Sequence, residues 1–414
     1  MKKNVMVAQS GGPTAAINAS LAGVIRGAMS CEIYDRVYGA VHGISGVLEE
    51  NFIDLTECVK KDGEFPDRLA VSPAMYLGSC RFKMPRPDAD PAIYDQIFST
   101  LEKMEIGAFF YIGGNDSMDT VAKLAAVAAE RGSDIRFAGV PKTIDNDLVH
   151  TDHTPGYGSA AKFIATTMLE IAHDTYIYDL PCVTIVEIMG RDSGWLTAAA
   201  AMARNEYNIT PQLIYLPEGP FIQERFLEDV RNELKRSKNV VVAVSEGIRD
   251  ENGIYISAKE AVADKFGHMQ LSGVGKVLEN LVKKELGTKV RSIELSILQR
   301  CAGHIAAAAD LEESQQLGSY AVKKTEEGET GFMAAVRRLS DEPYEYVIET
   351  AALDDIANKA KIVPREWITE SENDVTEEMI RYIRPLIRGE AAISWTDGKP
   401  VYLSVAHLNH CGEK

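Results

Sequence analysis

The chain has 414 residues, of which 45% are hydrophobic, so it is long and apolar enough to form two or more domains with buried cores. It carries 44 Lys and Arg against 61 Asp and Glu, a net charge of −17. This balance argues against a nucleic acid or an acidic membrane as the main partner, although a local arginine cluster can still bind phosphate groups. No stretch approaches the ~20 apolar residues that a membrane-spanning helix needs.

Buried strands and amphipathic helices are predicted in alternation along the chain. The strands are expected at residues 5–8, 108–112, 135–140, 183–188, 213–216 and 240–244, and from about Lys289. The helices are expected at residues 17–28, 118–130, 160–173, 195–204, 224–236 and 271–286, and from 304 to about 324, with Ser159 capping the third. Such alternation predicts an α/β fold with right-handed crossovers. Beyond Thr325 the sequence is less regular.

The cysteines, at positions 31, 58, 80, 182, 301 and 411, are dispersed and form no CxxC pair. We therefore expect reduced thiols and a cytoplasmic location. The N-terminal Met1-Lys2-Lys3 runs directly into an apolar strand, so no signal peptide is expected.

A glycine pair, Ser10-Gly11-Gly12, follows the first predicted strand. Glycines let a ligand approach the backbone, and the following helix offers its positive N-terminal end to an anion. On its own this pattern is equally typical of any tight strand–helix loop, and it matches neither the Walker A nor the dinucleotide pattern.

The turn Gly113-Gly114-Asn115-Asp116-Ser117 repeats the glycine pair and adds a carboxamide and a carboxylate. Asp116 is a candidate ligand for Mg²⁺, which prefers oxygen atoms, although capping the next helix would also explain it.

A third turn, Pro141-Lys142-Thr143-Ile144-Asp145-Asn146-Asp147, follows the next predicted strand. One carboxylate can act as a base toward a hydroxyl while the lysine stabilises a transferring phosphoryl group. The structural alternative is an Asx-type turn with a surface lysine. Because the carboxyl ends of parallel strands share one edge, the turns together predict a magnesium–phosphate site.

With Met189-Gly190-Arg191 and Ser245-Glu246-Gly247 added, the motifs resemble the 6-phosphofructokinase family in order and spacing, from Met1 to about Asp310. The resemblance implies two Rossmann-like three-layer αβα domains with a mostly parallel sheet in each. It implies a phosphoryl-donor domain of residues 1–148 plus about 302–370. The sugar-phosphate domain would hold residues from about 149 to 301 plus about 371–414.

The resemblance also implies residue roles in phosphoryl transfer to the 1-hydroxyl of fructose 6-phosphate, a step of glycolysis and gluconeogenesis. The implied catalytic residues are Asp145 as the base, Lys142, Asp116 and Arg191. Those implied for the donor are Gly11, Gly12, Arg81, Gly114 and Ser117, with Asn115 and Asp116 for Mg²⁺. Those implied for fructose 6-phosphate are Thr143, Asp145, Met189, Gly190, Arg191, Glu246, Arg291 and Arg300.

The choice of phosphoryl donor depends on Asp116 and Lys142, since ATP-using members carry glycines at both positions. A carboxylate beside a nucleotide's α-phosphate costs about 4 kcal/mol at 4 Å and an effective dielectric of 20, or roughly a thousandfold in affinity. Lys142 supplies a cation for a smaller donor. The pair resembles the pyrophosphate-dependent branch of the family, whose reaction is expected to run both ways.

Three positions depart from the family pattern: Asn115 replaces a metal-binding aspartate, Cys182 an arginine that reaches a neighbouring subunit, and Ile297 a polar contact to the sugar phosphate. The alternatives are an ATP-dependent phosphofructokinase, a kinase of NAD or lipid, and a catalytically inactive regulatory subunit. The expected partners are fructose 6-phosphate and pyrophosphate, with no nucleic acid and no membrane. The expected assembly is a homodimer or homotetramer.

Overall fold

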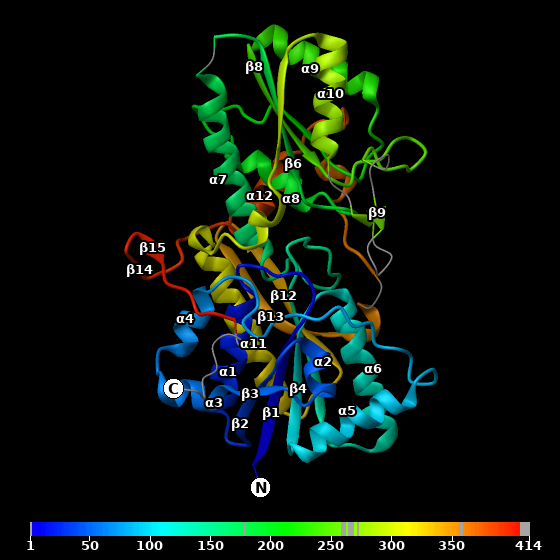
Figure 1. Cartoon of the computed structure of the whole chain (residues 1–414), viewed down its shortest axis with the longest axis vertical. Helices are drawn as coiled ribbons and strands as arrows, with labels where there is room; N and C mark the ends of the chain where they lie inside the picture. Colours follow the sequence, from blue (N-terminus) through cyan, green and yellow to red (C-terminus); the bar gives the residue numbers. More distant parts are fainter. Residues whose placement is uncertain are drawn as a thin grey trace.

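Alternating strands and helices build two α/β bodies in this computed structural model, stacked end to end with the N-terminus at the free end of the lower one (Figure 1). The structure describes residues 2–177, 179–257, 262–263, 269–270, 273–356 and 359–405.

The lower body is built on a sheet that has seven strands in the described residues. In spatial order they are β13 (Tyr344–Ala352), β12 (Phe332–Asp341), β5 (Arg136–Pro141), β4 (Ile106–Gly113), β1 (Lys3–Gln9), β2 (Tyr34–Ala40) and β3 (Phe52–Asp54). The five inner strands are parallel, and the edge strands β13 and β3 pair antiparallel.

Helices cover both faces of this sheet, so side chains alternate between two cores along each inner strand. On β1, Val5 and Val7 join one hydrophobic cluster and Met6 and Ala8 the other. The helices are α1 (Ile17–Ser30), α2 (Gly43–Leu48), α3 (Leu55–Lys61), α4 (Phe65–Val71), α5 (Pro91–Lys103), α6 (Asn115–Arg131) and α11 (Ala308–Glu326).

The upper body contains a parallel sheet in the order β11 (Lys289–Glu294), β6 (Cys182–Ile188), β8 (Asn239–Ser245) and β7 (Leu213–Tyr215). Its helices are α7 (Tyr157–Tyr176), α8 (Trp195–Ala198), α9 (Gln223–Arg236), α10 (Val274–Leu286) and α12 (Glu377–Ile383). Shorter elements are β9 (Val262–Ala263), β10 (Met269–Gln270), β14 (Trp395–Thr396), β15 (Lys399–Pro400) and the 3₁₀ turns Ala199–Ala203, Ser296–Arg300, Gly303–Ile305, Leu353–Asp355 and Arg365–Trp367.

The C-terminal part of the chain joins both bodies. After β13 it enters the upper body, where Val363, Ile368 and Met379 are buried in the cluster under α7 and α8 (Figure 1). Farther on, Leu403 packs against the core of the lower body, and its N–H donates to Ser72 Oγ at 2.9 Å. The chain thus crosses between the bodies more than once, and the domain boundaries given above stay a prediction.

The expected α/β fold with mostly parallel sheets is confirmed, and every predicted strand is present. The antiparallel pair β12–β13 was missed in the irregular C-terminal part. The segment 195–204 forms one α-turn followed by a 3₁₀ turn rather than one helix. Residues 271–272 of the predicted helix 271–286 lie outside the described residues.

Two further expectations were wrong. Helix α7 begins at Tyr157, and Asp310 satisfies its first N–H groups by accepting from Gly156 and Ser159 at 2.9 Å each, so Ser159 is not the cap. Cys58 is disulfide-bonded, so not all six cysteines are reduced thiols.

None of the helices in the described residues is both long and apolar enough to cross a bilayer.

Candidate active site

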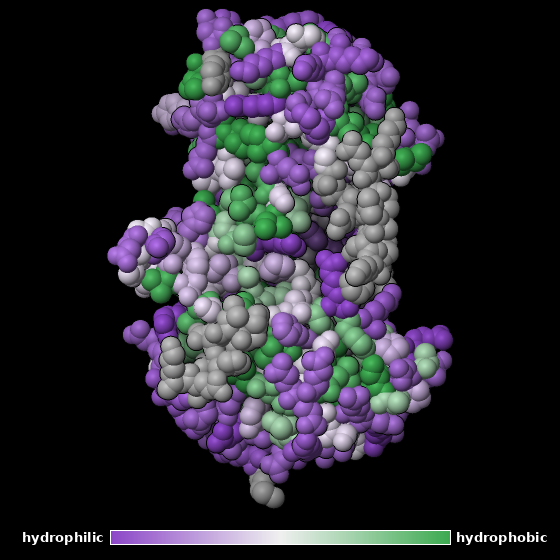
Figure 2. Space-filling view, viewed as in Figure 1, coloured by the Kyte–Doolittle hydropathy of each residue, from purple (hydrophilic) through white to green (hydrophobic). Residues whose placement is uncertain are grey.

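Three loops meet at the carboxyl edge of the lower sheet, after β1, β4 and β5. The Lys142 N–H donates to the carbonyl of Gly113 at 2.9 Å, and the Lys142 ammonium donates to the carbonyl of Gly12 at 2.7 Å. A Cβ on Gly11, where φ is +83°, would lie 3.1 Å from the Lys142 Nζ atom. The first glycine loop is thus shaped around the lysine of the third. Figure 2 shows hydrophilic side chains recessed at the waist between the two bodies.

Lys142 is a buried cation, with only 2% of its surface exposed. Burial lowers the pKa of Lys142 to about 8, against the opposing effect of the Asp145 and Asp147 charges, and the nearby Arg300 lowers it further. An ammonium in so little water interacts strongly with any anion that enters. The structural alternative, an Asx-type turn with a surface lysine, is therefore excluded.

Asp145 is held by the backbone on both sides. Its N–H donates to Thr143 Oγ1 at 3.1 Å, and its carbonyl accepts from Ser193 Oγ at 3.1 Å. Burial, reinforced by the Asp147 charge, raises the pKa of Asp145 to about 6, although Lys142, Arg191 and Arg300 oppose the rise. Burial also raises the pKa of Asp147. A carboxyl group with a pKa near neutrality is suited to general base catalysis.

Two arginines reach the same place from the upper body. A Cβ on Gly12 would lie 3.5 Å from the guanidinium of Arg300, and both Arg300 and Arg191 lower the pKa of Asp145. The Nε atoms of Arg191 and Arg300 are buried and have no hydrogen-bond partner among the described residues. Buried donors of this kind need an acceptor, and phosphate oxygens match a guanidinium well.

Glu246 and the loop 189–191 form the opposite wall. Glu246 Oε1 accepts from the Gly190 N–H at 3.3 Å, and burial raises the pKa of Glu246 to about 7. Gly190 has φ +139°, and a Cβ on Gly247 would lie 1.9 Å from the carbonyl of Arg191. The two loops are therefore in backbone contact. The Met189 N–H donates to the side chain of Gln299 at 3.2 Å.

The turn after β4 offers oxygen ligands to a divalent metal ion. The Asn115 Oδ1 atom is buried without a hydrogen-bond partner among the described residues, while its Nδ2 donates to Asp147 Oδ2 at 3.5 Å. This oxygen and the neighbouring carboxylate suit Mg²⁺, which takes one or two protein ligands and completes its shell with water and substrate phosphates. No cage of three or more His, Cys, Asp or Glu residues occurs in the described parts of the chain.

One predicted residue, Arg291, makes its contacts away from this cluster. Arg291 extends from β11 toward the end of α7, where it donates to Thr184 Oγ1 at 3.1 Å, to Asp174 at 2.5 Å and to Thr175 Oγ1 at 3.1 Å. Asp116 and Arg81 are exposed. Gly114 is at the N-cap of α6, and the buried Ser117 hydroxyl fills the space where a Cβ on Gly113 would lie, at 1.9 Å.

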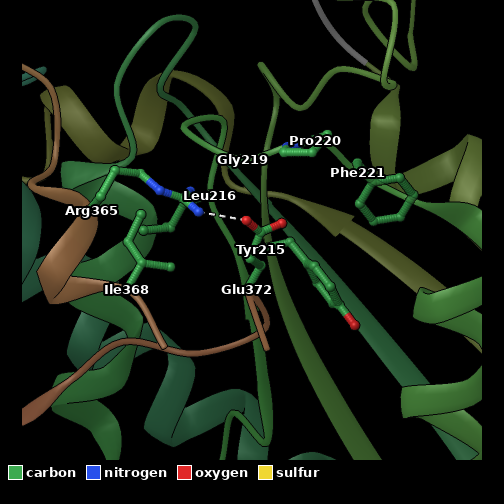
Figure 3. A pocket seen from close by; sticks show the side chains of 8 residues that line it. All are labelled: Tyr215, Leu216, Gly219, Pro220, Phe221, Arg365, Ile368 and Glu372. Atoms are coloured by element: carbon green, nitrogen blue, oxygen red, sulfur yellow. Dashed lines mark hydrogen bonds and ion pairs between the residues drawn. The ribbon is translucent and has the colours of Figure 1, made fainter. Parts of the chain in front are cut away.

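A small pocket elsewhere contains none of the predicted residues (Figure 3). Its rim is closed by an ion pair between Arg365 and Glu372 at 2.5 Å. It lies beside β7, in the upper body.

Sequence reasoning missed the residues that support the catalytic turn. Asn146 stands between Asp145 and Asp147 with φ +54°, and Lys361 donates to its side-chain oxygen at 3.3 Å. The Asp-Asn-Asp pattern could have predicted a left-handed backbone conformation at Asn146, because Asn adopts this conformation more readily than most non-glycine residues. Lys361 had no such signal, since it lies in a stretch without a motif.

A half-buried base, a buried ammonium and two guanidinium groups with unpaired Nε atoms around one recess are characteristic of phosphoryl transfer. The phosphofructokinase family profile matches residues 4–325. The chain belongs to the phosphofructokinase family.

Two relatives and one solved structure match nearly the whole chain. A pyrophosphate–fructose 6-phosphate 1-phosphotransferase from Xanthomonas campestris pv. campestris (strain B100) is 40% identical over 98% of this chain and 96% of its own. The enzyme of the same name from Halomonas elongata is 37% identical over 97% and 96%. The crystal structure of a pyrophosphate-dependent phosphofructokinase from Marinobacter aquaeolei has a TM-score of 0.86 at 36% identity and covers 97% of this chain and 95% of that one.

Proposed function

We propose that the protein transfers a phosphoryl group reversibly from pyrophosphate to the 1-hydroxyl of fructose 6-phosphate, with Mg²⁺, giving fructose 1,6-bisphosphate and phosphate. The observation that carries the proposal is the buried Lys142 ammonium beside Asp145 and the Gly12 carbonyl. Relatives of this chain with the pyrophosphate-dependent activity support it, and ATP-dependent members are more distant.

Asp145 acts as the base. With a pKa of about 6, it is largely ionised at neutral pH and accepts the proton of the 1-hydroxyl as that oxygen attacks phosphorus. The bond from phosphorus to the bridging oxygen breaks, and phosphate leaves. Lys142 and Arg191 stabilise the charge that spreads over the transferring group. Arg300, predicted above for the 6-phosphate, lies beside Gly12 and near Asp145, so we assign it to the transferring group instead. Asn115, with Asp116 in the same turn and Asp147 beside it, would hold Mg²⁺, which supplies further positive charge to the pyrophosphate oxygens.

The acceptor sugar would lie between Thr143 on the lower body and the residues Met189, Gly190 and Glu246 on the upper body. Arg291 points away from its own chain's catalytic cluster. Its predicted contact with the 6-phosphate therefore requires a neighbouring subunit, in a homodimer or homotetramer whose acceptor sites are shared. A cytoplasmic location fits these substrates.

Because Asp116 is exposed, its carboxylate repels a nucleotide's α-phosphate less strongly than a buried carboxylate would. In a solvated cleft, the repulsion between two unit charges at 4 Å falls from about 4 kcal/mol toward about 1 kcal/mol. The Asp116 carboxylate can still occupy the room of a nucleotide's α-phosphate, but the buried Lys142 contributes the larger electrostatic preference for pyrophosphate.

An inactive regulatory subunit is disfavoured, because the base, the buried cation and Arg191 are all present. A kinase of NAD or lipid is disfavoured because residues 143–147 and 189–191 match the sugar-phosphate elements.

The test is to incubate the purified chain with fructose 6-phosphate, pyrophosphate and MgCl₂ and to measure fructose 1,6-bisphosphate and phosphate in equal amounts. Adding fructose 1,6-bisphosphate and phosphate should regenerate pyrophosphate, and EDTA should stop both directions. Absence of turnover in both directions with folded protein would refute the proposal.

A further inference from the structure

The catalytic turn contains one residue in the left-handed backbone conformation. Asn146 lies between Asp145 and Asp147 with φ +54°, in the left-handed region that non-glycine residues seldom adopt. This conformation sets the directions in which the two flanking carboxylates leave the backbone. A residue persists in such a conformation when its surroundings over-determine it.

The side chain of Asn146 is fully engaged below the turn. Its Oδ1 accepts from the Thr154 N–H at 3.1 Å and from the Lys361 ammonium at 3.3 Å. Its Nδ2 donates to the Tyr382 hydroxyl at 2.8 Å, and that hydroxyl donates to the Asp152 carbonyl at 2.7 Å. Two of these partners, Lys361 and Tyr382, come from the C-terminal hundred residues, for which the sequence offered no role.

Lys361 makes more contacts than this one. Its ammonium also donates to the carbonyl of Asp152 at 2.6 Å and of Thr151 at 3.2 Å, and it lies 5.2 Å from the centre of the Trp195 ring. Its backbone N–H donates to the carbonyl of Asp147 at 2.7 Å. Both ends of Lys361 therefore hold the segment from Asn146 to Asp152.

The same short segment is fixed to the upper body. The Lys361 carbonyl accepts from Trp195 Nε1 at 3.1 Å, and the Val363 N–H donates to Glu218 at 3.0 Å. Glu218 also accepts from the Gly194 N–H at 2.7 Å, at the start of α8. Residues 361–363 thus connect the catalytic turn to the loop that carries Arg191.

We propose that Lys361 is a positioning residue for phosphoryl transfer, which holds Asn146 in its left-handed conformation and so aims Asp145 and Asp147 into the cleft. Lys361 has no contact with the substrates in this role; it acts through the turn. The inference rests on the proposed function, because the effect is read on pyrophosphate-dependent turnover.

The primary variant is Lys361→Met, which keeps the length of the side chain and removes its charge and donors. We expect kcat to fall by roughly ten- to a hundredfold, since small misplacements of reacting groups are costly. The KM values for fructose 6-phosphate and pyrophosphate should change less than about threefold, because the binding groups stay in place. Tyr382→Phe, which removes only the hydroxyl, should also lower kcat with little change in the KM values, but by a smaller factor.

The matched control is Lys162→Met. Lys162 also anchors the C-terminal part, by donating to the Gly389 carbonyl at 2.5 Å and pairing with Glu390 at 2.6 Å, but it has no contact with the turn. Its removal should lower stability without the loss in kcat. A crystal structure of Lys361→Met should show Asn146 with a changed φ.

Three results distinguish a positioning role of Lys361 from a general structural effect and from failure of the proposed function. An inactive wild-type enzyme means that the proposed function fails, and this is seen before any variant is made. A folded Lys361→Met enzyme with kcat within about twofold of wild type overturns the positioning role. Equal losses of kcat in Lys361→Met and Lys162→Met also overturn it, because they indicate a general structural effect.

Discussion

The kcat/KM of the forward reaction should follow a bell-shaped pH curve whose two limbs belong to Asp145 and Lys142. Asp145 must be ionised to accept the hydroxyl proton, so the rate rises through its pKa of about 6. Lys142 must be protonated to stabilise the phosphoryl group, so the rate falls through its pKa of about 8. The optimum is therefore expected near pH 7.

The magnitude follows from the fractions ionised. One pH unit beyond either pKa, only about a tenth of the group is in its active form, so kcat/KM should drop about tenfold at pH 5 and again at pH 9. Burial is the largest cause of the raised pKa of Asp145 and of the lowered pKa of Lys142. The charge of each residue partly opposes the shift of the other. The two limbs are therefore closer together than the ordinary values of the two groups would place them.

The assay is a stopped-time measurement of fructose 1,6-bisphosphate from pH 5 to 9.5, with both substrates well below their KM values so that the rate reports kcat/KM. Lys142→Arg is the informative variant, because a guanidinium stays protonated throughout this range and should remove the alkaline limb. Lys361 also has a pKa lowered to about 8 by burial, so a limb that persists in an active Lys142→Arg enzyme would assign it to another group. A flat wild-type profile between pH 5 and 9 would refute the reasoning about both residues.

Asp145→Ala should abolish turnover while calorimetry still shows binding of fructose 6-phosphate; retained turnover would exclude Asp145 as the base. Burial alone would lower the pKa of His153, but Glu313 and Asp152 raise it to about 9. The protonated His153 therefore stabilises the fold fully below about pH 6.5, and this stabilisation is lost as the pH rises through 9. The melting temperature should fall over that window, and a His153→Gln variant should show a flatter dependence. Gly23→Ala would place a Cβ 2.1 Å from the Gln315 carbonyl between α1 and α11, so it should cost about 1–3 kcal/mol of stability with kcat unchanged. An unchanged melting temperature would show that the two helices separate easily.

Sequence patterns were informative where a structure depends on local periodicity. The apolar runs of β4, β5, β6 and β8 are buried on both faces, so they are nearly continuous and easy to recognise. The pair β12–β13 was missed because its edge strand, YEYVIETAA, is only half-buried and two glutamates interrupt its apolar residues. Helix α7 is stabilised at its start by Asp310, which is distant in sequence and leaves no local capping signal.

The same limit applies to the site. The turns 113–117 and 141–147 were recognisable, because glycines and carboxylates directly after buried parallel strands are typical of ligand-binding loops. Their support by Lys361 and Tyr382 was not, since both contacts join residues more than 200 positions apart in the chain. The environment of Lys142 was also hidden, because burial depends on how the loops close around it.

The most direct test of the account is the ratio of kcat/KM for pyrophosphate to that for ATP, measured with fructose 6-phosphate and Mg²⁺. We expect wild type to prefer pyrophosphate by at least about a hundredfold, and Asp116→Gly combined with Lys142→Gly to lose pyrophosphate activity and gain measurable ATP use. A wild-type enzyme that uses ATP as well as pyrophosphate, or a double variant that keeps full pyrophosphate activity, would contradict the account.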